Sequence, residues 1–196
     1  MNITSQMVKE LREKTNAGMM DCKKALTDTD GNMEKAVDLL RQKGLAVAAK
    51  RAGKETREGV IEAYIHGGGK IGVMVEVACE TDFVAKTDDF KAFARNIAMH
   101  VAAVNPLALS RDDVSAEVLQ REKDIYINQA LESGKPQQIA EKMVAGKMEK
   151  FLAEVCLLEQ KYVKNPDLSV QDLLNELVAK MGENISIKKF ARFQIG

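Results

Sequence analysis

The sequence contains no tryptophan, few other aromatic residues, few prolines and no excess of charge of either sign. Aromatic residues make up 5% of the 196 residues, and the 29 basic residues balance the 29 acidic ones. Binding of nucleic acid through its phosphates requires a basic surplus or a basic stripe. Beyond the Lys188–Lys189 pair and a basic stretch near residue 50, no such stripe is present. We therefore expect no direct nucleic-acid partner.

Cysteine is also scarce, and the three cysteines, Cys22, Cys79 and Cys156, are isolated from one another. A disulfide framework or a cysteine zinc site needs paired or closely spaced cysteines, so neither is predicted. Isolated thiols favour a reducing cytoplasmic location. No stretch resembles a signal peptide or approaches the ~20 apolar residues of a membrane span. We expect a cytoplasmic protein without a membrane partner, unless an organelle transit peptide has been removed.

What the chain does contain is typical of a globular protein with a core, since 45% of its residues are hydrophobic and 10 are methionine. Its length suits one large or two small domains. Periodicity and turn residues predict an N-terminal domain over residues 1–44, a connector over 45–58 and a core domain over 59–196. The connector is rich in alanine and basic residues, and the sequence leaves open whether it extends a helix or forms a flexible tether.

The N-terminal domain has the pattern of three short helices. Thr4 or Ser5 is suited to cap the first helix, which the Asn16-Ala17-Gly18 turn ends, and a second runs from about residue 19 to 26. Asn32 can cap the third, and Gly44 is predicted to stop it. A bundle this small is only marginally stable by burial alone, so we expect it to dock on a partner.

The core domain is predicted as α+β, a small antiparallel sheet with helices packed on one side. Residues 61–66 and 71–77 alternate in polarity around the loop Gly67-Gly68-Gly69-Lys70, the pattern of a hairpin. A third strand is predicted near the C-terminus, where one parity is apolar except at Lys189: Ile185, Ile187, Ala191, Phe193 and Ile195. Helices are predicted over about 87–104, from Ser115 to Ser133-Gly134, from Pro136 onward, and over about 170–181.

The residues Glu80-Thr81-Asp82-Phe83-Val84 lie where the second predicted strand gives way to a helix. Such a turn lies at the surface, and an aromatic residue beside an acid at a loop tip suggests an anchor for another molecule. The alternative is that Phe83 folds back over the following helix. Likewise, Met19-Met20 follows a turn and is compatible with either a core position or an adaptable contact surface.

Other motifs give weak evidence of chemistry. The Gly67–Lys70 loop lacks the Ser or Thr and the helix that a phosphate-binding loop requires. His66 and Cys79 resemble a base and a nucleophile, but the hairpin register places them at opposite ends of their strands. His100 lies beside an apolar helix stripe and is interpreted as structural. With two histidines far apart in sequence, no metal site and no cofactor are predicted.

Four stretches, in order along the chain, resemble bacterial translation elongation factor Ts: VKELREKTNAGMMDCKKAL (8–26), CETDFVA (79–85), SGKP with IAEKM (133–136 and 139–143), and MGENI (181–185). At 196 residues the chain is similar to the family's short form, in which one compact core replaces two tandem subdomains and a coiled-coil module. The resemblance implies a possible homodimer, with the final strand as a natural pairing edge. A cysteine that links protomers in some relatives is Ala191 here, which argues against a disulfide-linked dimer but not against a non-covalent one.

The resemblance also implies a function, guanine-nucleotide exchange on elongation factor Tu, and it implies that the protein is not an enzyme. In that family Phe83, with Asp82 and the adjoining Thr81 and Val84, would insert near the magnesium side of the nucleotide site. Met19, Met20 and Lys23 would dock the N-terminal bundle, and His66 would contact another domain of the GTPase. In a short form, a dimer would supply His66 and Phe83 from different chains.

Two alternatives come from other classes. A ubiquitin-associated-type module with an unrelated core predicts that residues 1–44 alone keep the binding activity. An enzyme using His66 or Cys79 predicts a small-molecule ligand and loss of activity when either residue is changed.

Overall fold

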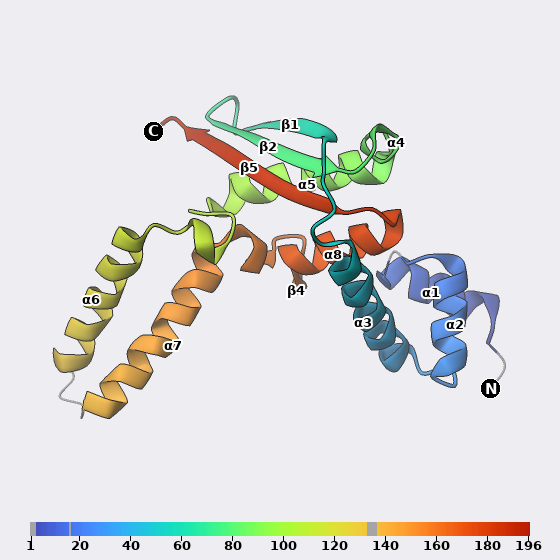
Figure 1. Ribbon diagram of the computed structural model, residues 1–196, viewed down its shortest axis with the longest axis horizontal. Coiled ribbons are helices and arrows are strands. Elements are labelled where there is room, and N and C mark those ends of the chain that lie inside the picture. Colours follow the sequence, from blue (N-terminus) through green and yellow to red (C-terminus); the bar gives the residue numbers. More distant parts are fainter. Residues whose placement is uncertain (1–2, 16, 133–136) are drawn as a thin grey trace. The chain divides into compact units, whose positions relative to one another are not determined.

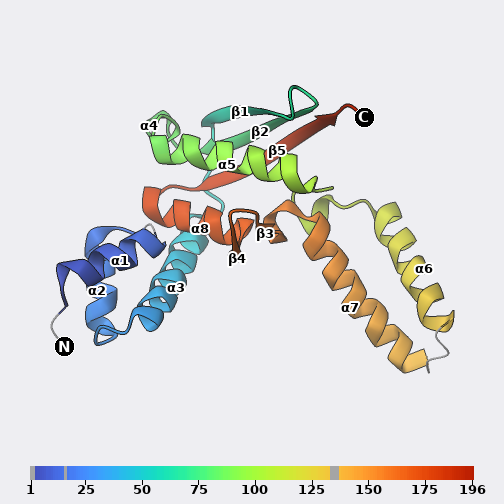
Figure 2. The ribbon, with the colours of Figure 1, turned by 180° about the vertical axis from the view of Figure 1, so that it is seen from behind.

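The structure, a computed structural model, describes residues 3–15, 17–132 and 137–196 and has an α+β fold (Figures 1 and 2). Residues 1–63, 75–96 and 172–188 belong to one compact unit, and residues 64–74, 97–171 and 189–196 to a second. The sequence predicted helix ends at Asn16-Ala17-Gly18 and Ser133-Gly134 and a helix start at Pro136. Of these, Asn16 and residues 133–136 lie outside the described residues. The division into domains at 1–44, 45–58 and 59–196 stays a prediction.

Three helices form the N-terminal part of the first unit: α1 (Ser5–Thr15), α2 (Met19–Asp28) and α3 (Met33–Arg51) (Figure 1). The predicted caps are present, because Thr4 accepts a hydrogen bond from the backbone of Met7, and Asn32 accepts one from the backbone of Lys35 at 3.0 Å. The helices enclose a small core of their own, made of Val8, Leu11, Cys22, Ala25, Leu26 and Ala36.

The prediction that Gly44 ends the third helix is wrong, because α3 continues to Arg51. A glycine within a helix costs only about 1 kcal/mol, which tertiary contacts can offset. Here α3 packs against α8 (Val170–Met181): Arg41 forms a 2.8 Å ion pair with Asp172, and a side chain at Gly44 would lie 3.7 Å from Ala179. The first half of the connector is therefore an extension of the helix.

The sheet has the strand order β1-β2-β5, and each strand continues from one unit into the other: β1 (Glu58–His66), β2 (Ile71–Cys79) and β5 (Ile185–Gln194). All three strands were predicted. The loop between β1 and β2 uses three glycines with φ of 61°, 66° and 91°, values that other residues rarely adopt. In β2, Val73, Val75 and Val77 of the predicted apolar set are almost fully buried, and Ile71 is half-buried.

The predicted apolar side of the C-terminal strand is buried only at its start. Ile185 and Ile187 are buried, whereas Ala191, Phe193 and Ile195, which have the same parity, are exposed. Residues of one parity lie on one face of a strand, so the more buried face of β5 changes along its length. Beyond the exposed Lys188 and Lys189, Phe190 and Arg192 of the other parity are half-buried. In β1, similarly, Ile61 and Ile65 lie on an exposed face.

Helices complete the fold. The first unit contains the one-turn helix α4 (Asp82–Ala85), and α5 (Asp88–Val104) runs on into the second unit, ending where Asn105 adopts a positive φ of 50°. In the second unit α6 (Ala116–Glu132) and α7 (Gln137–Val155) form a helical hairpin, visible in both ribbon views. Ser115 caps α6 as predicted. The sequence did not predict four short elements. One, η1 (Arg111–Asp113), precedes α6, and three follow α7: η2 (Leu157–Glu159), β3 (Lys161–Tyr162) and β4 (Asn165–Ser169).

His100 lies in the core of the second unit, as its structural interpretation predicted. Its side chain is fully buried, with Nε2 3.0 Å from Oε1 of Gln160 and Nδ1 accepting a hydrogen bond from the backbone of Val163. These partners place the ring proton on Nε2, and burial lowers the pKa of His100. In the part of the chain that the structure describes, no helix is both long and apolar enough to span a membrane.

Candidate functional site

The turn that carries Phe83 comprises residues 80–84, and within it Thr81 caps α4. The Thr81 hydroxyl accepts a hydrogen bond from the backbone N–H of Val84 at 3.5 Å. The carboxylate of Glu183 binds Thr81 from the other side, accepting from its backbone N–H at 3.0 Å and from its hydroxyl at 2.6 Å. Thr81 is therefore held both by its own helix and by a residue 102 positions later. We call residues 80–84 the Phe83 turn.

Phe83 is 80% exposed, the most exposed of the large hydrophobic residues in the described part of the chain. The alternative in which the ring folds back over the following helix is therefore wrong. Its neighbour Val84 is buried and packs into the core, so Val84 is not a surface residue in this structure. An exposed aromatic ring beside a buried anchor is typical of a contact surface for another protein.

Asp82 lies next to the ring and already has a basic partner. Lys86, one helical turn later, donates a 2.5 Å hydrogen bond to its carboxylate. That hydrogen bond lowers the pKa of Asp82, so the group is ionised at neutral pH. A partner protein would therefore meet an ion pair beside the ring, and contact with a cation would require Asp82 to exchange partners.

A second exposed apolar surface lies at the start of α2. Met20 is 74% exposed and Met19 is also exposed, so the structure favours the contact-surface interpretation over a core position. Lys23 is exposed and lies four and three residues after them, on the same helix face. The flexible thioethers of methionine suit a surface that adapts to a partner.

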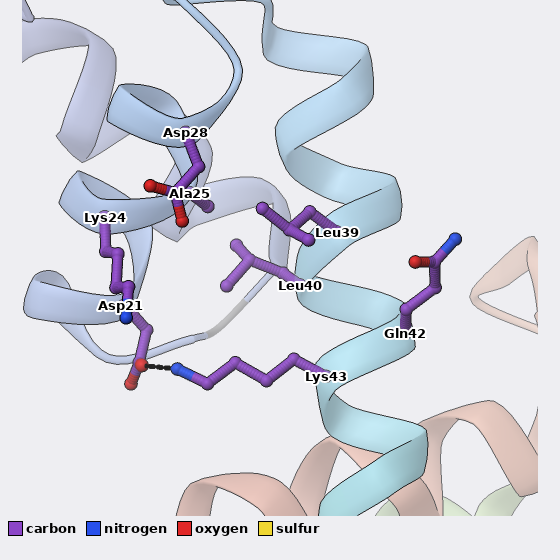
Figure 3. Close-up of a pocket in the computed structure, with 8 residues that line it drawn as sticks. All are labelled: Asp21, Lys24, Ala25, Asp28, Leu39, Leu40, Gln42 and Lys43. Carbon is purple, nitrogen blue, oxygen red and sulfur yellow. Dashed lines mark hydrogen bonds and ion pairs between the residues drawn. The ribbon is translucent and has the colours of Figure 1, made fainter.

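Beside this surface, a pocket of about 370 Å³ opens between α2 and α3 (Figure 3). Ala25, Leu39 and Leu40 are apolar residues that line it. Lys43 extends from α3 to form an ion pair with Asp21 of α2 (Figure 3). This ion pair joins the two helices next to the methionines.

His66 lies in the second unit at the end of β1 and is exposed. Its ring stacks on Tyr64 with the centroids 5.9 Å apart, and Nδ1 lies 3.2 Å from the tyrosine hydroxyl. These two contacts orient the imidazole at the surface. His66 and the Phe83 turn belong to different units.

The cysteines are buried thiols without the properties of a nucleophile. Burial raises the pKa of Cys79 to about 11, and the nearby Glu183 carboxylate contributes to the increase. Its Sγ donates to the carbonyl oxygen of Thr81 at 3.1 Å, which makes it part of the support of the turn. Among the described residues, no cluster of His, Cys, Asp and Glu is arranged to hold a metal ion.

Sequence reasoning missed Glu183 and Asn184, which support the turn. Glu183 binds Thr81, and Asn184 binds Glu80 of the turn and the backbone of Lys54. Both lie in a stretch that carries the family resemblance, but no periodicity or spacing links positions a hundred residues apart. The arrangement as a whole, an exposed ring and an exposed methionine pair on supported elements, is that of a protein that binds another protein.

Comparison with known proteins identifies the class. The whole chain, residues 1–196, matches the family Elongation factor TS. The elongation factor Ts of Desulfotalea psychrophila is 74% identical over 196 residues, which is the full length of both chains. Those of Desulfosudis oleivorans and Carboxydothermus hydrogenoformans are 64% and 63% identical over 194 residues, covering 99% of this chain and 98% and 89% of theirs. The chain belongs to the elongation factor Ts family, and its role is in translation elongation.

Proposed function

We propose that this protein is the guanine-nucleotide exchange factor for elongation factor Tu, working in the cytoplasm by binding alone, without a cofactor. It binds the GDP form, accelerates GDP release and dissociates when GTP enters. Membership of the family supports the partner. The observation that carries the mechanism is Phe83, whose ring is 80% exposed on a turn that is supported from two sides.

The physical basis is reciprocal coupling between two ligands of one protein. A protein that weakens GDP binding to the GTPase must itself bind the GTPase more weakly, by the same ratio, when GDP is present. Tight nucleotide binding by such a GTPase depends on Mg²⁺ and on backbone amides around the phosphates. Inserting the Phe83 ring between elements of the GTPase shifts both without touching the nucleotide, and Asp82 accompanies it on the magnesium side.

The remaining predicted contact residues divide into two groups. Met19, Met20 and Lys23 dock the N-terminal helices on the nucleotide-binding domain, and His66 contacts another domain of elongation factor Tu. Thr81 and Val84 contribute indirectly: Thr81 caps α4, and Val84 anchors it in the core.

The test is the release of a fluorescent GDP analogue from elongation factor Tu, followed by stopped flow with and without this protein. Acceleration by the wild type that is largely lost in Phe83→Ala supports both the function and the insertion of the ring. Acceleration that survives the substitution keeps the function and removes the role of Phe83. With no acceleration at all the proposal fails, and a peptide-binding role of residues 1–44 becomes the next hypothesis.

We further propose a non-covalent homodimer formed around β5. Four apolar side chains of the second unit are exposed there: Ile65, Met74, Phe193 and Ile195. The backbone N–H of Ile195 donates to the carbonyl of Lys70 at 2.9 Å, and a side chain at Gly72 would lie 3.4 Å from Ile65. The exposed residues thus share one region of the sheet, and a second copy would cover them. Light scattering should give a dimer for the wild type and a monomer for Phe193→Asp, with Leu131→Asp as an exposed control; a monomeric wild type refutes the dimer.

In such a dimer, His66 and Phe83 act from different chains. Mixing Phe83→Ala with a His66 variant that is inactive by itself, for example His66→Asp if it meets that condition, and allowing subunits to exchange should then restore activity, because half of the sites in a mixed dimer contain both native residues. If both residues act from the same chain, the mixture shows only the average of the two variants.

A further inference from the structure

The loop after α8, residues 182–184, is hydrogen-bonded to the Phe83 turn in both directions. Glu183 accepts two hydrogen bonds from Thr81, at 3.0 Å and 2.6 Å. In return, the backbone N–H of Asn184 donates to the carboxylate of Glu80 at 2.6 Å. All of these residues belong to the first unit. Hydrogen bonds to ionised carboxylates are roughly twice as strong as neutral ones, so the turn and the loop form one rigid arrangement.

The same loop also binds the segment that follows the N-terminal helices. The side-chain amide of Asn184 donates to the carbonyl of Lys54 at 2.6 Å, three residues beyond the end of α3. Arg51, the last residue of α3, lies 3.6 Å from the carboxylate of Glu80. One loop therefore contacts both the Phe83 turn and the segment that leads to the methionine surface.

These contacts matter because α4 is a single helical turn, which has no stability of its own in water. The direction of the Phe83 ring depends on Thr81, since the Thr81 cap sets where α4 begins. The ring itself is exposed and has little packing to hold it. Glu183, which accepts both hydrogen bonds from Thr81, is therefore one of the groups that hold the residue from which α4 and the ring begin.

We propose that Glu183 and Asn184 are positioning residues for nucleotide exchange: Glu183 holds the Phe83 turn in the orientation that enters the partner, and Asn184 holds the end of the connector beside it. The inference rests on the proposed exchange function. It adds that the two contact surfaces are presented to the GTPase as one preorganised unit, which lowers the entropy lost on binding.

A spectroscopic test does not depend on exchange activity. The chain contains no tryptophan, so Phe83→Trp introduces a single indole at the tip of the turn. Its fluorescence anisotropy should fall when Glu183→Ala is added, and it should return with Glu183→Gln. Glutamine can accept from the Thr81 N–H through its oxygen and donate to the hydroxyl through its amide. Circular dichroism and thermal unfolding establish that each variant is folded.

The kinetic test is a double-mutant cycle between Glu183→Ala and Phe83→Ala, measured as GDP release from elongation factor Tu. In the native background Glu183→Ala should lower the maximal exchange rate by about tenfold, equivalent to about 1.4 kcal/mol. In the Phe83→Ala background it should have little further effect, because a positioning residue acts through the ring. Asn184→Ala should instead raise the half-saturating concentration and leave the maximal rate nearly unchanged.

Several outcomes overturn the inference. An equal effect of Glu183→Ala in both backgrounds would mean general destabilisation rather than positioning. Unchanged anisotropy together with unchanged exchange would show that the ring is held without Glu183, while the exchange function stands. If the wild type does not accelerate GDP release, the exchange function is refuted and the kinetic test no longer applies. The anisotropy measurements alone then decide whether Glu183 orders the turn.

Discussion

Truncating the exposed ring in Phe83→Ala should separate exchange from folding. Because the residue is 80% exposed, its removal should change the free energy of unfolding by no more than about 0.5 kcal/mol. Burying a phenylalanine side chain contributes about 1.5–3 kcal/mol, and the exposed four-fifths can contribute about 1.2–2.4 kcal/mol in a partner. If this energy is used only to drive GDP release, the maximal exchange rate should fall by about 8- to 60-fold.

The assay is stopped-flow release of a fluorescent GDP analogue from elongation factor Tu over a series of exchange-factor concentrations. The maximal rate and the half-saturating concentration are obtained separately, and the former should change much more than the latter. Leu131→Ala is the matched control, since Leu131 is also exposed and lies on α6, far along the sequence. Equal losses of rate and affinity, or a comparable loss in the control, would refute the assignment of Phe83 to the exchange step.

Four further substitutions test other parts of the structure. Met20→Ala should weaken docking, visible as a higher half-saturating concentration, and His66→Ala should have a smaller effect of the same kind; equal losses of exchange and binding in both would contradict this division. Burial raises the pKa of Glu176 to about 7, so the folded protein holds a proton that the unfolded chain releases above about pH 4.5. Urea unfolding at a series of pH values should therefore show the wild type losing stability relative to Glu176→Gln as pH rises from 4.5 towards 7, and parallel curves would refute it. The hydroxyl of Tyr162 is buried with no hydrogen-bond partner among the described residues, so Tyr162→Phe should raise the thermal midpoint or leave it unchanged; a marked decrease would reveal an unseen partner.

Features set by local chemistry were predictable from the sequence. Asn32 and Ser115 cap their helices as predicted, because a cap depends on one side chain and a backbone N–H three residues later. The glycine hairpin and the strands around it also follow from local pattern. Gly44 shows the limit of this reasoning, because a local propensity of about 1 kcal/mol is offset by contacts with a helix more than a hundred residues away.

The candidate site, too, was predictable from the sequence only in part. The family resemblance pointed to Phe83 and Met20, and the exposure of both is visible only in the structure. Spacing alone left open whether either side chain was buried. The apolar parity of the C-terminal strand predicted one face, but it did not show that this face is buried only at Ile185 and Ile187, because burial depends on which elements cover the sheet. The Thr81–Glu183 pair lay beyond any local pattern.

The helical geometry of α4 explains how a strongly exposed ring can lie next to a buried valine. Successive residues of a helix point about 100° apart, so four residues in one turn divide into an outward half, Asp82 and Phe83, and an inward half, Val84 and Ala85. The inward half anchors the turn in the core, and Thr81 fixes where the turn starts. If the helix began one residue earlier, Phe83 would turn inward, and if it began one residue later, Val84 would turn outward. The hydrogen bonds from Thr81 to Glu183 hold the residue at which the turn starts. If the proposed exchange function holds, a change at Glu183 should therefore alter exchange although Glu183 is not among the predicted contact residues.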